Sequence, residues 1–190
     1  MRLEVRPLTA DRWNDFVELA SRPGASILRS CWCAHYRTTG QGYTPAANKR
    51  LMRGLVTSGT VPGLIAYREG RPVGWISVGP REDYPRLANS PIMKPIDDTP
   101  VWSIVCFFID AHERGKGISK ALLEGAIAFA RSQGARLLEA YPVDKRERSH
   151  PLSLWWGTKS LFDRAGFREA ARRQQTRPVV RRKIRPRTRG

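Results

Sequence analysis

A glycine-rich segment at residues 109–119 reads IDAHERGKGIS and lies between two apolar stretches of different pattern. Before it, residues 100–110 are mostly apolar at both odd and even positions, which is typical of a strand buried on both faces. After it, apolar residues recur at the spacing of one helix face, at Leu122, Leu123, Ala126, Ile127 and Ala130. The segment is therefore predicted to be a tight turn between a central strand and a helix.

Such a turn has the properties of an anion-binding site. The first backbone N–H groups of the helix are free, and the positive end of the helix dipole attracts negative charge. Gly115 and Gly117 would let the backbone approach a phosphate closely. The spacing differs from that of the nucleoside triphosphate loop, and Lys120 stands where the dinucleotide fingerprint has its third glycine. From the residues alone, we predict a site for a pyrophosphate-like group.

The rest of the chain reads as alternating strands and helices around this unit. A strand at residues 136–143 completes a strand–helix–strand unit, and residues 63–67 and 73–78 are typical of a hairpin. We further expect a short strand at residues 3–7, helices at residues 9–21, from 44 onward and at 159–165, and strands at 167–173 and 178–184. No internal repeat or second-domain boundary is evident, so the fold class is one mixed α/β domain.

Two motifs resemble those of a known family. Arg114-x-x-Gly117-x-Ser119 resembles the Arg/Gln-x-x-Gly-x-Gly/Ala signature of the GNAT N-acetyltransferase superfamily, with serine in the last position. Residues 161–167, LFDRAGF, are similar to that family's closing Leu-Tyr-x-x-x-Gly-Phe box. The resemblance implies a central mixed, mostly antiparallel sheet of about six to seven strands with helices on both faces. It implies a single domain, which we place at residues 1–184, and the arginines beyond it predict a basic tail at 185–190.

The resemblance also implies a function, the transfer of an acetyl group from acetyl-CoA to a primary amine by direct nucleophilic attack. Main-chain groups of Phe107, Phe108 and Ile109 would then bind the pantetheine arm. The pyrophosphate of acetyl-CoA would be bound by Arg114, Gly115, Lys116, Gly117, Ile118, Ser119 and Lys120.

One position departs from the family pattern. The tyrosine of the closing box, which in the family protonates the departing thiolate, is Phe162 here. Phenylalanine has no proton to donate, so this role is vacant, filled by another group or left to water. A thiol has an ordinary pKa near about 8.5, so the thiolate needs only modest help to leave.

The attacking amine must lose a proton, and we expect Glu139 and Tyr141, on one face of the predicted 136–143 strand, as the candidates to accept it. A carboxylate within an apolar strand is costly unless it is paired or used. The alternative for Glu139 is an ion pair with a nearby arginine. Asp144 and Glu82 are weaker candidates for the base.

Residues between the first helices and in the long 79–100 loop are candidates to contact the acceptor amine. We predict Trp32, His35, Tyr36 and Glu82 as its binding residues, and the loop as a lid over it. Cys31, Cys33 and His35 form only one metal-like cluster, whereas a structural zinc ion needs four ligands, so no metal is predicted. Trp155 and Trp156 could stack on the acceptor or pack in the core.

The composition leaves one alternative class open. The chain of 190 residues carries a net charge of +17, from 34 basic and 17 acidic residues, and residues 168–190 hold ten Lys and Arg against Glu169. A basic field of this kind attracts nucleic acid, which makes a nucleic-acid- or ribosome-associated module the rival interpretation. Nucleic acid is not favoured, because no aromatic residues are interleaved with the basic tail. A non-catalytic acyl-CoA sensor is the third interpretation.

The remaining expectations concern location and assembly. No run of about 18 apolar residues is present, so no membrane span or membrane association is expected, and the first residues do not read as a signal peptide. Three cysteines, two of them too close for an easy disulfide, favour the reducing cytoplasm. A homodimer is left open.

Overall fold

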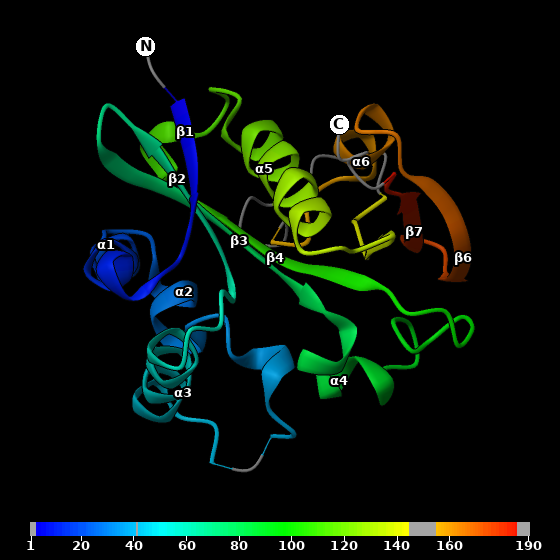
Figure 1. The fold of residues 1–190 in the computed structure, drawn as a ribbon, viewed down its shortest axis with the longest axis horizontal. Coiled ribbons are helices and arrows are strands. Elements are labelled where there is room, and N and C mark those ends of the chain that lie inside the picture. Colours follow the sequence, from blue (N-terminus) through cyan, green and yellow to red (C-terminus); the bar gives the residue numbers. More distant parts are fainter. Residues whose placement is uncertain (1–2, 41, 145–154, 186–190) are drawn as a thin grey trace.

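The computed structural model describes residues 3–40, 42–144 and 155–185 and contains one seven-stranded sheet (Figure 1). Its strand order is β1-β2-β3-β4-β5-β7-β6. The strands are β1 (Leu3–Pro7), β2 (Gly63–Arg68), β3 (Arg71–Pro80), β4 (Trp102–Ile109), β5 (Leu137–Ala140), β6 (Arg168–Gln174) and β7 (Arg177–Lys183). Among the strand pairs of the described residues, only β4–β5 is parallel. The predicted mixed, mostly antiparallel sheet is therefore confirmed.

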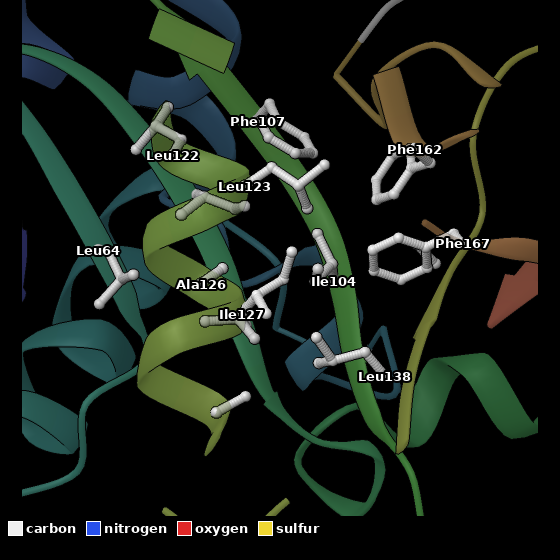
Figure 2. Close-up of a cluster of buried hydrophobic side chains, with 14 of the residues drawn as sticks. Leu64, Ile104, Phe107, Leu122, Leu123, Ala126, Ile127, Leu138, Phe162 and Phe167 are labelled. Carbon is white, nitrogen blue, oxygen red and sulfur yellow. The ribbon is translucent and has the colours of Figure 1, made fainter. Parts of the chain in front are cut away.

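Helices cover both faces of this sheet, because β2 and β3 alternate apolar side chains between them. Leu64 and Ile76 join the core beneath α5 (Ile118–Ser132), together with Leu122 and Ile127 (Figure 2). The neighbouring Ile65 and Trp75 face the opposite way. There they pack against α1 (Trp13–Ser21), α2 (Ser26–Cys31) and α3 (Pro45–Thr57). The short helix α6 (Lys159–Arg164) precedes β6.

The pairing of β4 changes halfway along the strand. On one side β4 pairs with β3 over its whole length, with a register shift between Ser77 and Val78. On the other side β5 pairs only with residues Trp102–Ile104. The second half of β4 therefore has no partner in β5, and the sheet opens there. A segment just before α6 approaches the gap, since the Phe107 amide donates to the Trp155 carbonyl at 2.5 Å and Val143 bridges to Thr158.

Two local predictions need correction, and one helix was not predicted. The helix expected at 9–21 begins as a 3-10 turn, Ala10–Arg12, because the Thr9 hydroxyl bonds Asp11 and Arg12 side chains instead of capping the backbone. The helix α2 was not predicted, since six residues are too few to show a period. The expected 79–100 loop contains a 3-10 turn, Arg81–Asp83, and the one-turn helix α4 (Pro85–Ala88).

Among the residues that the structure describes, no helix is both long enough and apolar enough to cross a membrane.

Candidate functional site

A cleft of about 720 Å³ opens where β4 and β5 separate. Its floor is the second half of β4, from Cys106 to Ile109. The glycine turn before α5 forms the end next to Ile109, and Tyr36, from the 3-10 turn His35–Arg37, packs near Cys106. The helix α2 also lines the cleft, and Gly24, just before it, lies beside Ala111 near the glycine turn. The remaining wall is the segment from Trp155 to Thr158 together with Leu161 and Arg164. The cleft thus joins the predicted phosphate turn to part of the predicted acceptor region.

The glycine turn is built as an open cradle. Gly115 and Gly117 have φ angles of +75° and +81°, a left-handed conformation that favours glycine, and Gly117 is the N-cap of α5. No protein atom lies within 4 Å of the position that a Cβ would take at either glycine. Of the residues predicted for pyrophosphate, all line the cleft except Lys116. The backbone at the start of α5 can therefore receive an anion without displacing protein atoms.

Charged side chains hold this turn in place. The Arg68 Nε lies 3.1 Å from the Glu113 carboxylate, and its Nη2 donates to the Lys116 carbonyl at 3.2 Å. Lys116 also pairs with Glu113, at 3.4 Å. Glu113 is thus shared by two cations from outside the cleft, which leaves Arg114 and Lys120 as the basic residues that line this end. Lys120 has only a distant surface partner, Glu124, at 3.9 Å.

The predicted pantetheine residues Phe107, Phe108 and Ile109 all line the cleft. In an antiparallel pair, alternate residues direct their main-chain groups to the same side, so Ile109 presents its amide on the side where Phe107 bonds Trp155. The Phe107 amide already has the Trp155 carbonyl as its acceptor. Ile109 therefore offers the free main-chain groups nearest to the turn.

The predicted acceptor residues divide into two groups. His35 and Tyr36 line the cleft, with their ring centroids 4.9 Å apart. Trp32 is only 5% exposed and stacks on Trp13 at 6.2 Å, outside the cleft lining. Glu82, in the Arg81–Asp83 turn, also lies outside it. The structure adds Tyr43, which belongs to no periodic pattern or motif, and it places Trp156 in the cleft lining.

Trp156 links several of these groups. Its indole Nε1 donates to the Tyr36 hydroxyl at 2.8 Å. The guanidinium of Arg177 lies over the Trp156 ring, 3.5 Å from the centroid. Burial raises the pKa of Tyr36 to about 12 and lowers the pKa of Arg177. The Tyr36 hydroxyl is therefore protonated at any physiological pH.

All three cysteines are free and line the cleft. Cys33 accepts a hydrogen bond from Trp75 Nε1 at 3.0 Å. A hydrogen bond with Cys33 and burial raise the pKa of Cys31, and burial above all raises that of Cys33. Neutral thiols therefore form an apolar patch. Within the described ranges, no group of three or more His, Cys, Asp or Glu side chains is placed to hold a metal ion.

Glu139 and Tyr141, predicted as the base, lie outside the cleft lining in a buried network. The Glu139 carboxylate, 0% exposed, accepts bonds from Arg181 Nε at 2.7 Å, from the Tyr141 hydroxyl at 2.7 Å and from Arg81. Burial, and then the charge of Glu139, raise the pKa of Tyr141. The ion pair with arginine, stated as the alternative for Glu139, is present.

Arg81 and Arg181, together with Arg173, also bond to residues of the predicted lid. Arg81 also donates to the Met93 carbonyl, and Arg181 pairs with Asp97 at 2.6 Å. Arg173 of β6 donates to the carbonyls of Lys94 and Pro95, at 2.6 and 2.9 Å. No residue of the 79–100 loop is part of the cleft lining in the described structure. The loop is thus fastened beside β6 and β7, and these arginines are engaged within the chain.

Phe162 lies where the family resemblance places a tyrosine, but it belongs to the core. It is 0% exposed, and its ring contacts Phe107 and Phe167 at centroid distances of 6.0 and 5.0 Å (Figure 2). It does not line the cleft. Phe162 therefore offers no polar group to the cleft.

Comparisons with known proteins agree with this fold. The model of the acetyltransferase (GNAT) family matches residues 26–153. A search of curated proteins gives no match. The fold is similar to that of the PaiA N-acetyltransferase of Thermoplasma acidophilum in complex with coenzyme A, with a TM-score of 0.54 and 15% identity, over 97% of this chain and 100% of that one.

Two further structures have the same fold. An N-acetyltransferase from Staphylococcus aureus Mu50 has a TM-score of 0.56 and 16% identity, over 96% of this chain and 99% of that one. The polyamine N-acetyltransferase of Drosophila melanogaster, which catalyses the formation of N-acetylagmatine, has a TM-score of 0.56 and 13% identity, over 96% of this chain and 100% of that one. At these identities, the likeness is one of fold.

Proposed function

The chain belongs to the GNAT acetyltransferase family, and we propose that it transfers the acetyl group of acetyl-CoA to a primary amine by direct attack. The observation that carries this proposal is the continuity of the cleft. A left-handed glycine turn with free helix N–H groups opens at one end, and an aromatic pocket lies at the other. The half of β4 that has no partner in β5 joins the two. This is the arrangement that a long acyl donor with a phosphate end requires.

Acetyl-CoA would lie along this cleft in a defined direction. Its pyrophosphate would bind the backbone N–H groups from Gly115 to Lys120, with Arg114 and Lys120 beside them. The turn follows the end of β4, so the pantetheine arm would pass Ile109 first and then Phe107. The thioester would therefore reach the region of Cys106 and Phe107, beside Tyr36 and Trp156.

His35 is the proposed proton acceptor for the attacking amine. It lines the acceptor end of the cleft, whereas Glu139 is enclosed by Arg81 and Arg181. Burial, and then the charge of Arg86, lower the pKa of His35 below its ordinary value of 6.5. The imidazole would be neutral at pH 7 and able to take a proton from nitrogen as the C–N bond forms.

A pH profile tests this assignment. The neutral fraction of the amine also changes with pH, so kcat/KM is expressed per concentration of neutral amine. On that scale it should stay high down to about pH 6.5 and fall only below it, because the active form of His35 is neutral and its pKa is lowered. His35→Gln should lower kcat by about a hundredfold and remove this acid limb. A His35→Gln enzyme that keeps the acid limb of the wild type would show that another group accepts the proton.

The acceptor is proposed to be an amine on an apolar or aromatic body without a second positive charge. Among the described lining residues, the only carboxylate is Glu113, at the phosphate end and already paired. The aromatic walls are backed by cations, since Arg86 lies over Tyr43 at 5.9 Å and Arg177 over Trp156 at 3.5 Å. A second cation on the acceptor would meet positive charge behind these rings instead of a partner.

An amine panel with detection of released CoA thiol tests both the function and the acceptor class. We expect kcat/KM for phenethylamine or tryptamine to exceed that for putrescine and spermidine by about tenfold or more, because desolvating an unpaired cation is costly. A preference for the polyamines would contradict the acceptor class alone. Acetyl-CoA binding without turnover of any amine would favour the acyl-CoA sensor.

The enzyme and nucleic-acid interpretations predict different results for a chain that lacks its basic tail. Removing residues 185–190 should leave amine turnover unchanged if the chain is an enzyme for small amines. A nucleic-acid module should lose affinity for its ligand and the salt dependence of binding.

A further inference from the structure

We propose that Tyr36 donates a hydrogen bond to the departing CoA thiolate and so fills the role that Phe162 leaves vacant. The inference rests on the proposed function, because it needs CoA in the cleft. It assigns a catalytic contact to a tyrosine from the 3-10 turn His35–Arg37, far from α6 in the sequence.

The position of Tyr36 suits this contact. Its ring packs in a cluster with Val105 and Cys106 of β4, and it lines the cleft. Trp156 donates to its hydroxyl, and the adjacent Trp155 accepts from the Phe107 amide. The Tyr36 hydroxyl is therefore held close to the point on β4 where the proposed path of the pantetheine arm ends.

The hydrogen bond with Trp156 also sets the direction in which Tyr36 donates. An indole N–H is only a donor, so the Tyr36 oxygen must be the acceptor at 2.8 Å. The tyrosine proton is then available to a second partner, and Tyr36 lines the cleft in which CoA would lie. Arg177 orients Trp156 from behind, since it lies over the ring and donates to the Tyr141 carbonyl at 3.2 Å. Trp156 and Arg177 are thus positioning residues.

In the proposed step, every bond and proton has a defined origin and destination. The amine nitrogen forms a bond to the carbonyl carbon, the C–S bond breaks, and its electron pair stays on sulfur. The proton that nitrogen loses passes to His35, and solvent carries a proton to the thiolate. Burial keeps the Tyr36 hydroxyl protonated, because its pKa is raised to about 12. Tyr36 is therefore a weaker acid than the thiol, and it stabilises the thiolate by hydrogen bonding without giving up its proton.

The pKa of the CoA thiol in the protein–CoA complex reports this contact, and no acceptor amine is needed to measure it. We expect the thiol of CoA bound to the wild-type protein to titrate about one pKa unit or more below the free thiol, followed by thiolate absorbance in the ultraviolet. Tyr36→Phe should abolish this shift, and Trp156→Phe should reduce it. In turnover, Tyr36→Phe should lower kcat about tenfold with little change in KM for acetyl-CoA.

Two controls make the outcomes separable. Acetyl-CoA has no free thiol, so its affinity should be the same for wild type and Tyr36→Phe, which also shows that the variant is folded. Tyr67→Phe removes a hydroxyl bonded to Asp15 at 2.6 Å, away from the cleft, and should leave the thiol shift intact. An equal thiol pKa in wild type and Tyr36→Phe would overturn the assignment of Tyr36. Failure of the wild type to bind CoA at all would instead overturn the proposed function.

Discussion

Acetyl-CoA is expected to bind at least about a hundredfold more weakly once Gly117 is replaced by glutamate. Gly117 has a φ of +81° and is the N-cap of α5, so its amide and the next ones form the proposed pyrophosphate site. No protein atom lies within 4 Å of the position that a Cβ would take at Gly117. A glutamate side chain would enter that space and set a carboxylate against the pyrophosphate. Titration calorimetry at physiological salt measures the loss directly.

The other end of the same helix supplies a matched control. Gly134 has a φ of +83°, and it too has no protein atom within 4 Å of its Cβ position. Gly134→Glu therefore introduces the same backbone strain and the same charge at the C-terminal end of α5. We expect it to bind acetyl-CoA with the affinity of the wild type. Equal losses in both variants would point to a damaged helix, and no loss in Gly117→Glu would show that the pyrophosphate lies elsewhere.

The parts of the fold that were predictable are those with a strong local pattern. The apolar run of β4, the glycine turn and the regular face of α5 each show their structure within a dozen or so residues of sequence, and the structure contains all three. The helix α2 has six residues, which is too short for a period to be visible. Missing α2 meant missing how Cys31 and Cys33 come to face the cleft beside Cys106.

The site was predictable only where neighbours in the sequence are neighbours in space. The turn from Arg114 to Lys120 is local, so its residues could be named together. The pair Tyr36 and Trp156 is 120 positions apart, and no pattern in one sequence reports such a contact. Glu139 stood out as a carboxylate in an apolar strand, yet its partners Arg81 and Arg181 lie 58 and 42 positions away. The sequence alone therefore left its role undecided between base and ion pair.

Glu139→Ala separates these two roles by its effect on stability. The carboxylate is fully buried and balances two arginines that are themselves largely buried, at 13% and 14% side-chain exposure. Removing Glu139 takes from Arg81 the carboxylate it pairs with and leaves Arg181 with the exposed Asp97. Breaking a buried charge network in this way costs about 3–5 kcal/mol of unfolding free energy. Denaturant unfolding should show this loss. Acetyl transfer measured well below the melting temperature should fall only severalfold, because Glu139 does not line the cleft.

Arg181 also has an exposed acidic partner. Asp97 pairs with Arg181 at 2.6 Å, but its side chain is 46% exposed. Water replaces such a carboxylate easily, so Asp97→Ala should destabilise the protein far less than Glu139→Ala. Glu139→Gln keeps the volume but not the charge, and it should fall between the two. A Glu139→Gln protein with wild-type stability and no acetyl transfer would make Glu139 the catalytic base and His35 a wall of the acceptor pocket.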